Sequence, residues 1–139
     1  MLVQGKRLFD EVASSLSGAS ATLLIHSDAG AVGIIDAMGS RTEMLDAHLD
    51  LIMNATAGRT VLFPTFNYDY CRTGNYVVAS DPSQVGALSE HARLRHPGCR
   101  TQTPVFNFVQ LGEPRVSASP LVNAFDSDST FGELARLHA

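Results

Sequence analysis

Apolar residues recur at helical spacing in several segments, and the two clearest predict amphipathic helices over residues 6–16 and 41–56. A capping box precedes the second segment, because the Ser40 hydroxyl can accept a hydrogen bond from the Glu43 N–H while the Glu43 side chain reaches back. Gly58 is placed to end that helix. Local signals therefore predict both limits of the second helix.

Two further helix starts are predicted from cap residues later in the chain. Asp81 is the expected N-cap of a helix with Pro82 at its first position, and Pro97 should end this helix. Thr130 and Glu133 have the spacing of another capping box, so a short helix is expected after them.

Three short apolar runs, residues 21–25, 60–63 and 105–111, predict β-strands. The segments 65–80 and 113–128 have neither helical nor strand period and are expected to be loops. Because helices and strands alternate, we expect a single α/β domain over the 139 residues, with a mainly parallel central sheet flanked by helices.

Composition and charge narrow the classes of partner. Only 17% of the residues are charged, against about 25% in ordinary globular chains, so part of the surface is expected to be covered by a partner subunit or by further chain. The formal net charge is −4 without a basic stripe, which argues against nucleic-acid binding. No secretion signal and no apolar run near the roughly 20 residues of a membrane span are found, so we expect a cytoplasmic protein. Cys71 and Cys99 form no CxxC pattern and are expected to be free thiols, buried or without function.

Polar residues gather where the first two predicted strands end. His26, Ser27 and Asp28 follow the first strand, and Thr65 to Asp69 follow the second. In open α/β sheets ligands bind at the carboxyl ends of the strands, so these segments are expected to share a pocket. The alternatives are structural: Ser27 and Asp28 cap a loop, His26 is a core histidine, and Asp69 belongs to a turn.

Several common catalytic patterns are absent. The chain has no GxGxxG, GxxxxGK[ST], HExxH or GxSxG. Its histidines lack metal-ligand spacing, and a zinc site at His91 and His96 is not favoured.

Four segments resemble, in order and spacing, motifs of the aminoglycoside 3-N-acetyltransferase family. Residues 24–33 (LIHSDAGAVG) are similar to its VHSSLxxxG segment, and residues 58–69 (GRTVLFPTFNYD) to GTLVMPTxxWD. Residues 85–90 (VGALSE) resemble MGxLxE, and residues 100–112 (RTQTPVFNFVQLG) resemble RSxHPxxSxxxxG. The family acylates an amino group of an aminoglycoside or other amino sugar, with acetyl-coenzyme A or another acyl-coenzyme A as co-substrate.

The resemblance implies a division of the site into a donor side and an acceptor side. On the acceptor side, Tyr68 and Asp69 match positions facing the amino sugar, where a carboxylate would attract an ammonium group. On the donor side, the resemblance implies that the coenzyme is bound by Ser27, Asp28, Gly33, Thr65, Gly86 and Arg100. Arg100 would pair with a phosphate of the coenzyme.

The chain also departs from the family pattern. Thr103 stands where members usually have His, Asn107 where they have Ser, and Asp28 where they have a second Ser. The family's general base is a histidine in a TxxHxxE helix, and these residues contain no counterpart to it. The resemblance covers about the first half of a typical member. His26 is the one candidate for a general base near the expected pocket. Two hypotheses follow. The first is an acyl-coenzyme A-dependent N-acyltransferase of amino sugars, for which either a homo-oligomer or a C-terminal half is the expected partner. The second is a non-catalytic interaction domain that keeps the fold without the base.

Overall fold

A central sheet of three strands organises the chain. The computed structural model describes residues 2–28, 34–35 and 39–139. In the sheet β2 (Thr22–Leu24) pairs in parallel with β4 (Thr60–Pro64), and β4 pairs antiparallel with β5 (Phe108–Leu111). A separate two-stranded parallel sheet joins β1 (Leu2–Val3) to β3 (Ile34–Ile35).

The α/β class is confirmed, and two of the three described strand pairings are parallel. The antiparallel direction of β5 was not anticipated from the sequence. Its strand is also shorter than the predicted 105–111, because Val105 lies in the left-handed region at φ 65° and keeps the chain out of extended geometry there.

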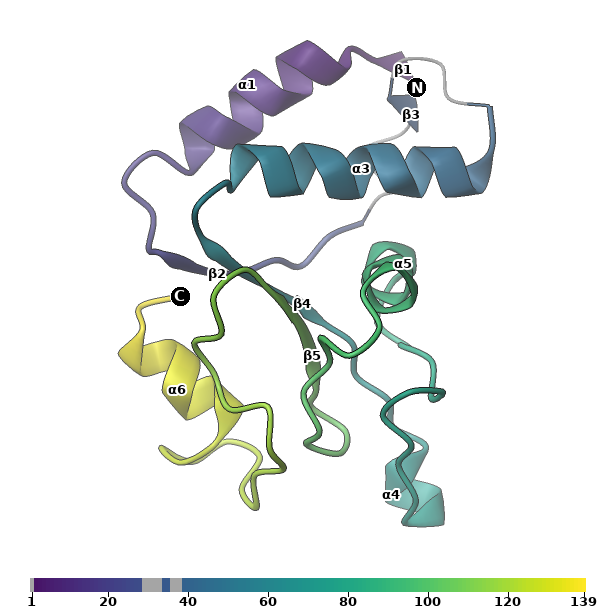
Figure 1. The fold of residues 1–139 in the computed structure, drawn as a ribbon, viewed down its shortest axis with the longest axis vertical. Helices are drawn as coiled ribbons and strands as arrows, with labels where there is room; N and C mark the ends of the chain where they lie inside the picture. The colour runs from purple at the N-terminus through teal and green to yellow at the C-terminus, as the bar shows by residue number, and fades with distance from the viewer. Residues whose placement is uncertain (1, 29–33, 36–38) are drawn as a thin grey trace.

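Helices cover both faces of the three-stranded sheet (Figure 1). One face packs against α3 (Arg41–Ala55) and α5 (Ala87–Arg95), while α1 (Gly5–Ser15) lies outside α3. Alternate strand residues supply this core, which contains Leu45, Leu49, Val61, Phe63, Leu88, Ala92, Val109 and Leu111.

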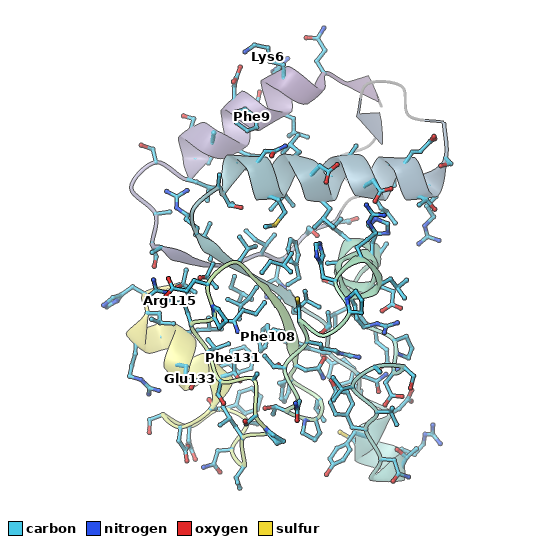
Figure 2. All side chains as sticks on the ribbon, in the orientation of Figure 1. Lys6, Phe9, Phe108, Arg115, Phe131 and Glu133 are labelled. Atoms are coloured by element: carbon cyan, nitrogen blue, oxygen red, sulfur yellow. The ribbon has the colours of Figure 1, made fainter. Side chains whose placement is uncertain are left out.

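The other face of the sheet packs against α6 (Thr130–Arg136), a short helix. Figure 2 shows Phe131 of α6 beside Phe108 of β5, and their ring centroids lie 5.6 Å apart. Two apolar residues in the preceding loop stay exposed, Val122 at 99% and Phe125 at 70%. The expected covering of apolar surface by a partner or further chain remains a prediction.

The capping box before α3 is confirmed. The Glu43 N–H donates to Ser40 Oγ at 3.1 Å, and the Ser40 N–H donates to Glu43 Oε2 at 2.8 Å. Gly58 follows the helix in a left-handed conformation, φ 81°, as expected for a helix end.

The two later helix starts were predicted wrongly. The helix expected from residue 81 begins at Ala87, because the Asp81 carboxylate accepts a hydrogen bond from the Val77 N–H at 2.9 Å instead of capping a helix. The cap of α6 is Ser129, whose Oγ accepts from the Gly132 N–H at 3.1 Å.

One further contact explains why Glu133 does not take part in a cap at the start of α6. The Glu133 carboxylate accepts from the Ser117 N–H at 3.0 Å, so it is not available for a capping box with Thr130. Within the segment expected to be a loop, the chain forms the short helix α4 (Tyr70–Thr73). No helix in the described part of the chain is long and apolar enough to cross a bilayer.

Candidate functional site

The carboxyl ends of β2 and β4 lie at the same edge of the sheet, because the two strands run parallel with Leu24 opposite Leu62. The residues that follow β2 include Ser27 and Asp28, and those that follow β4 include Thr65. The polar segments after both strands therefore face one edge of the sheet, while the pocket that they are expected to share remains a prediction.

Gly86, at the start of α5, approaches the end of β2. A Cβ built on Gly86 would lie 3.6 Å from the carbonyl oxygen of Ser27. Its backbone, with φ 124°, lies in a region that glycine adopts far more easily than other residues. The structure thus brings together two of the residues implied for the donor side.

The Ser27 hydroxyl is buried and has no hydrogen-bond partner. A buried hydroxyl without a partner costs about 1–3 kcal/mol. Ser27 therefore carries an unsatisfied donor and acceptor at the carboxyl edge of the sheet, close to Gly86. Asp28, the next residue, is exposed.

Thr65 is fully buried and belongs to a polar cluster instead of an open surface. Its hydroxyl donates to Asn107 Oδ1 at 2.8 Å, and Arg100 Nε donates to the same oxygen at 2.8 Å. Asn107 is also fully buried, so these three residues form an internal hydrogen-bond network under the site.

Arg100 is buried, and its guanidinium is bonded to the protein. Nη2 donates to the Thr65 carbonyl at 2.7 Å, and Nη1 donates to the carbonyls of Val78 and Asp81. The carbon Cζ lies 5.2 Å from the centre of the Tyr76 ring. Burial lowers the pKa of Arg100 and raises that of Tyr76 to about 12. The contacts describe a structural anchor for residues 65–81, and they give no support to a role on a coenzyme phosphate.

The implied acceptor residues Tyr68 and Asp69 are both exposed, just past the end of β4. Asn67 lies beneath them, buried, and its Oδ1 accepts from the Asp69 N–H at 2.9 Å. Gln84 donates from Nε2 to Asp69 Oδ2 at 3.1 Å and accepts the Tyr68 N–H at 2.8 Å through Oε1. The Asp69 carboxylate is thus accessible but held by a neighbour.

A cavity of about 260 Å³ opens beside Asp69. It is bordered by two carboxylates, one guanidinium, two amides, one hydroxyl and two apolar side chains, from Asn67, Asp69, Arg72, Thr73, Asn75, Val77, Asp81 and Pro82. The charged groups of this lining carry one more negative than positive charge, which favours a cationic ligand over an anionic one.

One short segment joins the donor and acceptor sides. Gln84 contacts Tyr68 and Asp69, and Gly86, two positions later, approaches Ser27. Because consecutive Cα atoms are about 3.8 Å apart, residues 84 and 86 cannot be separated by more than about 7.6 Å. The segment 84–86 therefore contacts both groups of candidate residues.

Other candidates do not join this group. His26 is exposed, and Gly33 lies outside the described residues. His91 Nε2 donates to Asp46 Oδ1, 2.8 Å away between α5 and α3, so His91 belongs to a helix-to-helix contact. Among the described residues no group of three or more acidic, histidine or cysteine side chains could hold a metal ion. Cys71 and Cys99 are free, as expected, but both are exposed.

Sequence reasoning missed Asn67 and Gln84. Each acts on residues near Asp69 through hydrogen bonds, with Gln84 coming from 15 positions further along the chain. No local pattern marks the contact of Gln84, whereas the bond between Asn67 Oδ1 and the Asp69 N–H spans two positions and is a local Asx turn. The only available signal for Gln84 was its position directly before the segment 85–90 that resembles a family motif.

The comparisons with known proteins give the fold. No family model and no curated protein matches the chain. Among the solved structures that do match, the apoenzyme of aminoglycoside acetyltransferase AAC(3)-IVa does so with a TM-score of 0.70 and 16% identity over 99% of this chain, and YokD protein from Bacillus subtilis with a TM-score of 0.59 and 17% identity over 78%. The chain spans about half the length of each, 52% and 50%. It shares the fold of a solved acetyltransferase.

Proposed function

We propose that the edge formed by β2, β4 and the start of α5 binds an acyl-coenzyme A and an amino sugar, for transfer of an acetyl or similar acyl group to the sugar's amino group. The observation that carries this proposal is the bridging of the two candidate groups by residues 84–86, with Ser27 on one side and Asp69 on the other. The fold shared with an acetyltransferase supports it.

On the donor side, the pantetheine arm of the coenzyme presents amide N–H and C=O groups. The buried Ser27 hydroxyl, which has no partner, can hydrogen-bond one of these amides. Gly86 leaves the backbone open to close approach.

On the acceptor side, the exposed Asp69 carboxylate attracts the ammonium of an amino sugar, while Tyr68 offers a ring against which a sugar can pack. The proposed reaction converts an ammonium and a thioester into an amide, free thiol and one proton. The amine nitrogen attacks the thioester carbonyl, a C–N bond forms, the C–S bond breaks, and the thiolate takes up a proton. A base must first remove a proton from the ammonium, and His26 is the candidate from this chain.

A thermal-shift experiment with acetyl-coenzyme A tests the donor side. At a hundredfold excess over Kd, binding stabilises a protein by about 2.7 kcal/mol, or roughly 8 °C for a domain of this size. Ser27→Ala should leave the unliganded protein at least as stable as the wild type, because the substitution breaks no hydrogen bond and removes the cost of burying the hydroxyl, while it should reduce the shift caused by the coenzyme.

Ser17→Ala, which removes an exposed hydroxyl, is the matched control. It should change neither the stability of the unliganded protein nor the thermal shift caused by the coenzyme. Absence of any shift at millimolar coenzyme would exclude the proposed function. A stability loss above about 1 kcal/mol in unliganded Ser27→Ala would instead assign this hydroxyl a structural role.

The second candidate is a non-catalytic domain of the same fold. It is favoured by the histidines of the described part of the chain: His48 and His91 are buried in or between helices, and His26 is exposed and shows no contact with Asp69. Mass-spectrometric detection of acetylated glucosamine after incubation with acetyl-coenzyme A separates the two. Coenzyme binding without acetylation would favour the non-catalytic domain.

A further inference from the structure

Gln84 makes three hydrogen bonds to the segment that follows β4. Its backbone N–H donates to the Phe66 carbonyl at 2.9 Å, its Oε1 accepts from the Tyr68 N–H at 2.8 Å, and its Nε2 donates to Asp69 Oδ2 at 3.1 Å. Main chain and side chain of one residue thus hold three positions of the acceptor segment.

The chemistry of these partners requires an amide at position 84. A backbone N–H can only donate, and an ionised carboxylate can only accept, so the bridging group must offer an acceptor to Tyr68 and a donor to Asp69. A primary amide on a side chain of this length meets both requirements. The same argument determines which end of the Gln84 amide is oxygen and which is nitrogen.

We propose that Gln84 is a positioning residue that fixes the Asp69 carboxylate for the ammonium group of the acceptor, an inference that rests on the proposed function. Oδ2 of Asp69 is bound to Gln84, and the partner of Oδ1 is Arg72, 3.5 Å away on α4. The Arg72–Asp69 pair is exposed, with 77% and 52% of the two side chains accessible. Solvent weakens this pair, so an incoming ammonium can compete for Oδ1.

The positioning has a direct consequence for affinity. A free aspartate must give up rotamer freedom when it binds a ligand, whereas Gln84 orders Asp69 before the ligand arrives. Ordering a side chain of this kind in advance changes affinity by about three- to tenfold.

NMR of Asp69 tests the positioning itself. Coupling constants about χ1 should show one dominant rotamer in the wild type and averaging in Gln84→Ala. Gln84→Glu keeps the acceptor for the Tyr68 N–H but loses the donor to Asp69, so the Tyr68 amide should stay protected from exchange while Asp69 leaves its wild-type rotamer. Gln102→Ala, which removes another exposed glutamine side chain, is the matched control. An unchanged Asp69 rotamer in both Gln84 variants would overturn the proposal.

A double-mutant cycle tests the effect on ligand binding. Titration with glucosamine should show affinity reduced about three- to tenfold by Gln84→Ala in the wild-type background, and by less than about twofold in the Asp69→Asn background. N-Acetylglucosamine, which has no ammonium, should bind weakly to all variants. An equal loss in both backgrounds would mean that Gln84 does not act through Asp69.

Failure of the proposed function has a different signature. If Asp69→Asn binds glucosamine as tightly as the wild type, the acceptor role of Asp69 is excluded, and the role of Gln84 in binding with it. If Asp69→Asn weakens binding but the Gln84 variants keep the Asp69 rotamer, only the positioning role is excluded.

Discussion

Arg100→Lys distinguishes an anchoring guanidinium from a coenzyme-binding one. The Arg100 side chain is buried and donates through all three nitrogens to partners in three separate segments, at Thr65, at residues 78–81 and at Asn107. Lysine keeps the charge and most of the length, but its donors sit on one atom, so it cannot reproduce the planar fork.

The magnitude follows from the bonds. Five described hydrogen bonds leave the guanidinium: two from Nε, two from Nη1 and one from Nη2. The lysine ammonium can occupy the position of only one guanidinium nitrogen, where it can form about two or three of the five hydrogen bonds. Two or three acceptors then lose their partner. At roughly 1.5 kcal/mol for each such bond, Arg100→Lys should cost about 3–4 kcal/mol of the unfolding free energy.

Urea unfolding followed by circular dichroism measures this loss. With a slope of about 2 kcal/mol/M, the midpoint should fall by roughly 1.5–2 M. Arg7→Lys is the control, because Arg7 is 77% exposed and pairs with Glu11 on the surface of α1; it should change stability by less than about 0.5 kcal/mol. A coenzyme-binding Arg100 predicts the reverse pattern: near-normal stability and lost coenzyme affinity. That result would refute the anchoring role.

Three further predictions concern stability. Gly86→Ala should cost about 1–3 kcal/mol in denaturant unfolding, since φ 124° is strained for alanine, and full stability would contradict this backbone geometry. Leu88→Ala, at 2% exposure, should cost about 2–5 kcal/mol, and Leu94→Ala, at 60%, under about 0.5 kcal/mol; equal losses would refute the assigned core. The hydrogen bond from His91 lowers the pKa of Asp46 in the folded protein. The ionised carboxylate therefore adds to the free energy of unfolding above the unfolded-state pKa, and this contribution is lost as pH falls through the lower folded-state pKa. Unfolding measured between about pH 3 and 6 should therefore show a flatter acid decline in Asp46→Asn than in the wild type.

The parts of the fold that sequence predicts best are those determined by neighbours in the chain. Ser40 and Glu43 lie three positions apart, and both bonds of their capping box form within one turn. Asp81 has an equally good local signature, yet it caps no helix. Its carboxylate binds the Val77 N–H and its carbonyl binds Arg100, 19 positions away. Long-range contacts override the local preference there.

The same distinction holds at the candidate site. The rule that ligands bind at strand ends directed attention to Ser27 and Asp69, and it depends only on where strands stop and on their parallel direction, which the pairing of β2 with β4 confirms. The contributions of Arg100 and Gln84 depend on which segments meet in space. Their partners lie up to 35 positions away, so residue type alone suggested a phosphate ligand for Arg100 and no role for Gln84.

The central claim is that an acyl-coenzyme A binds at the edge where β2, β4 and the start of α5 meet. Titration of the isotope-labelled protein with acetyl-coenzyme A, followed through its backbone amide signals, tests this claim directly. The account predicts saturable shifts concentrated at Ser27, Asp28 and residues 84–86, with little change along α1. Absence of shifts, or shifts confined to α1, would contradict it.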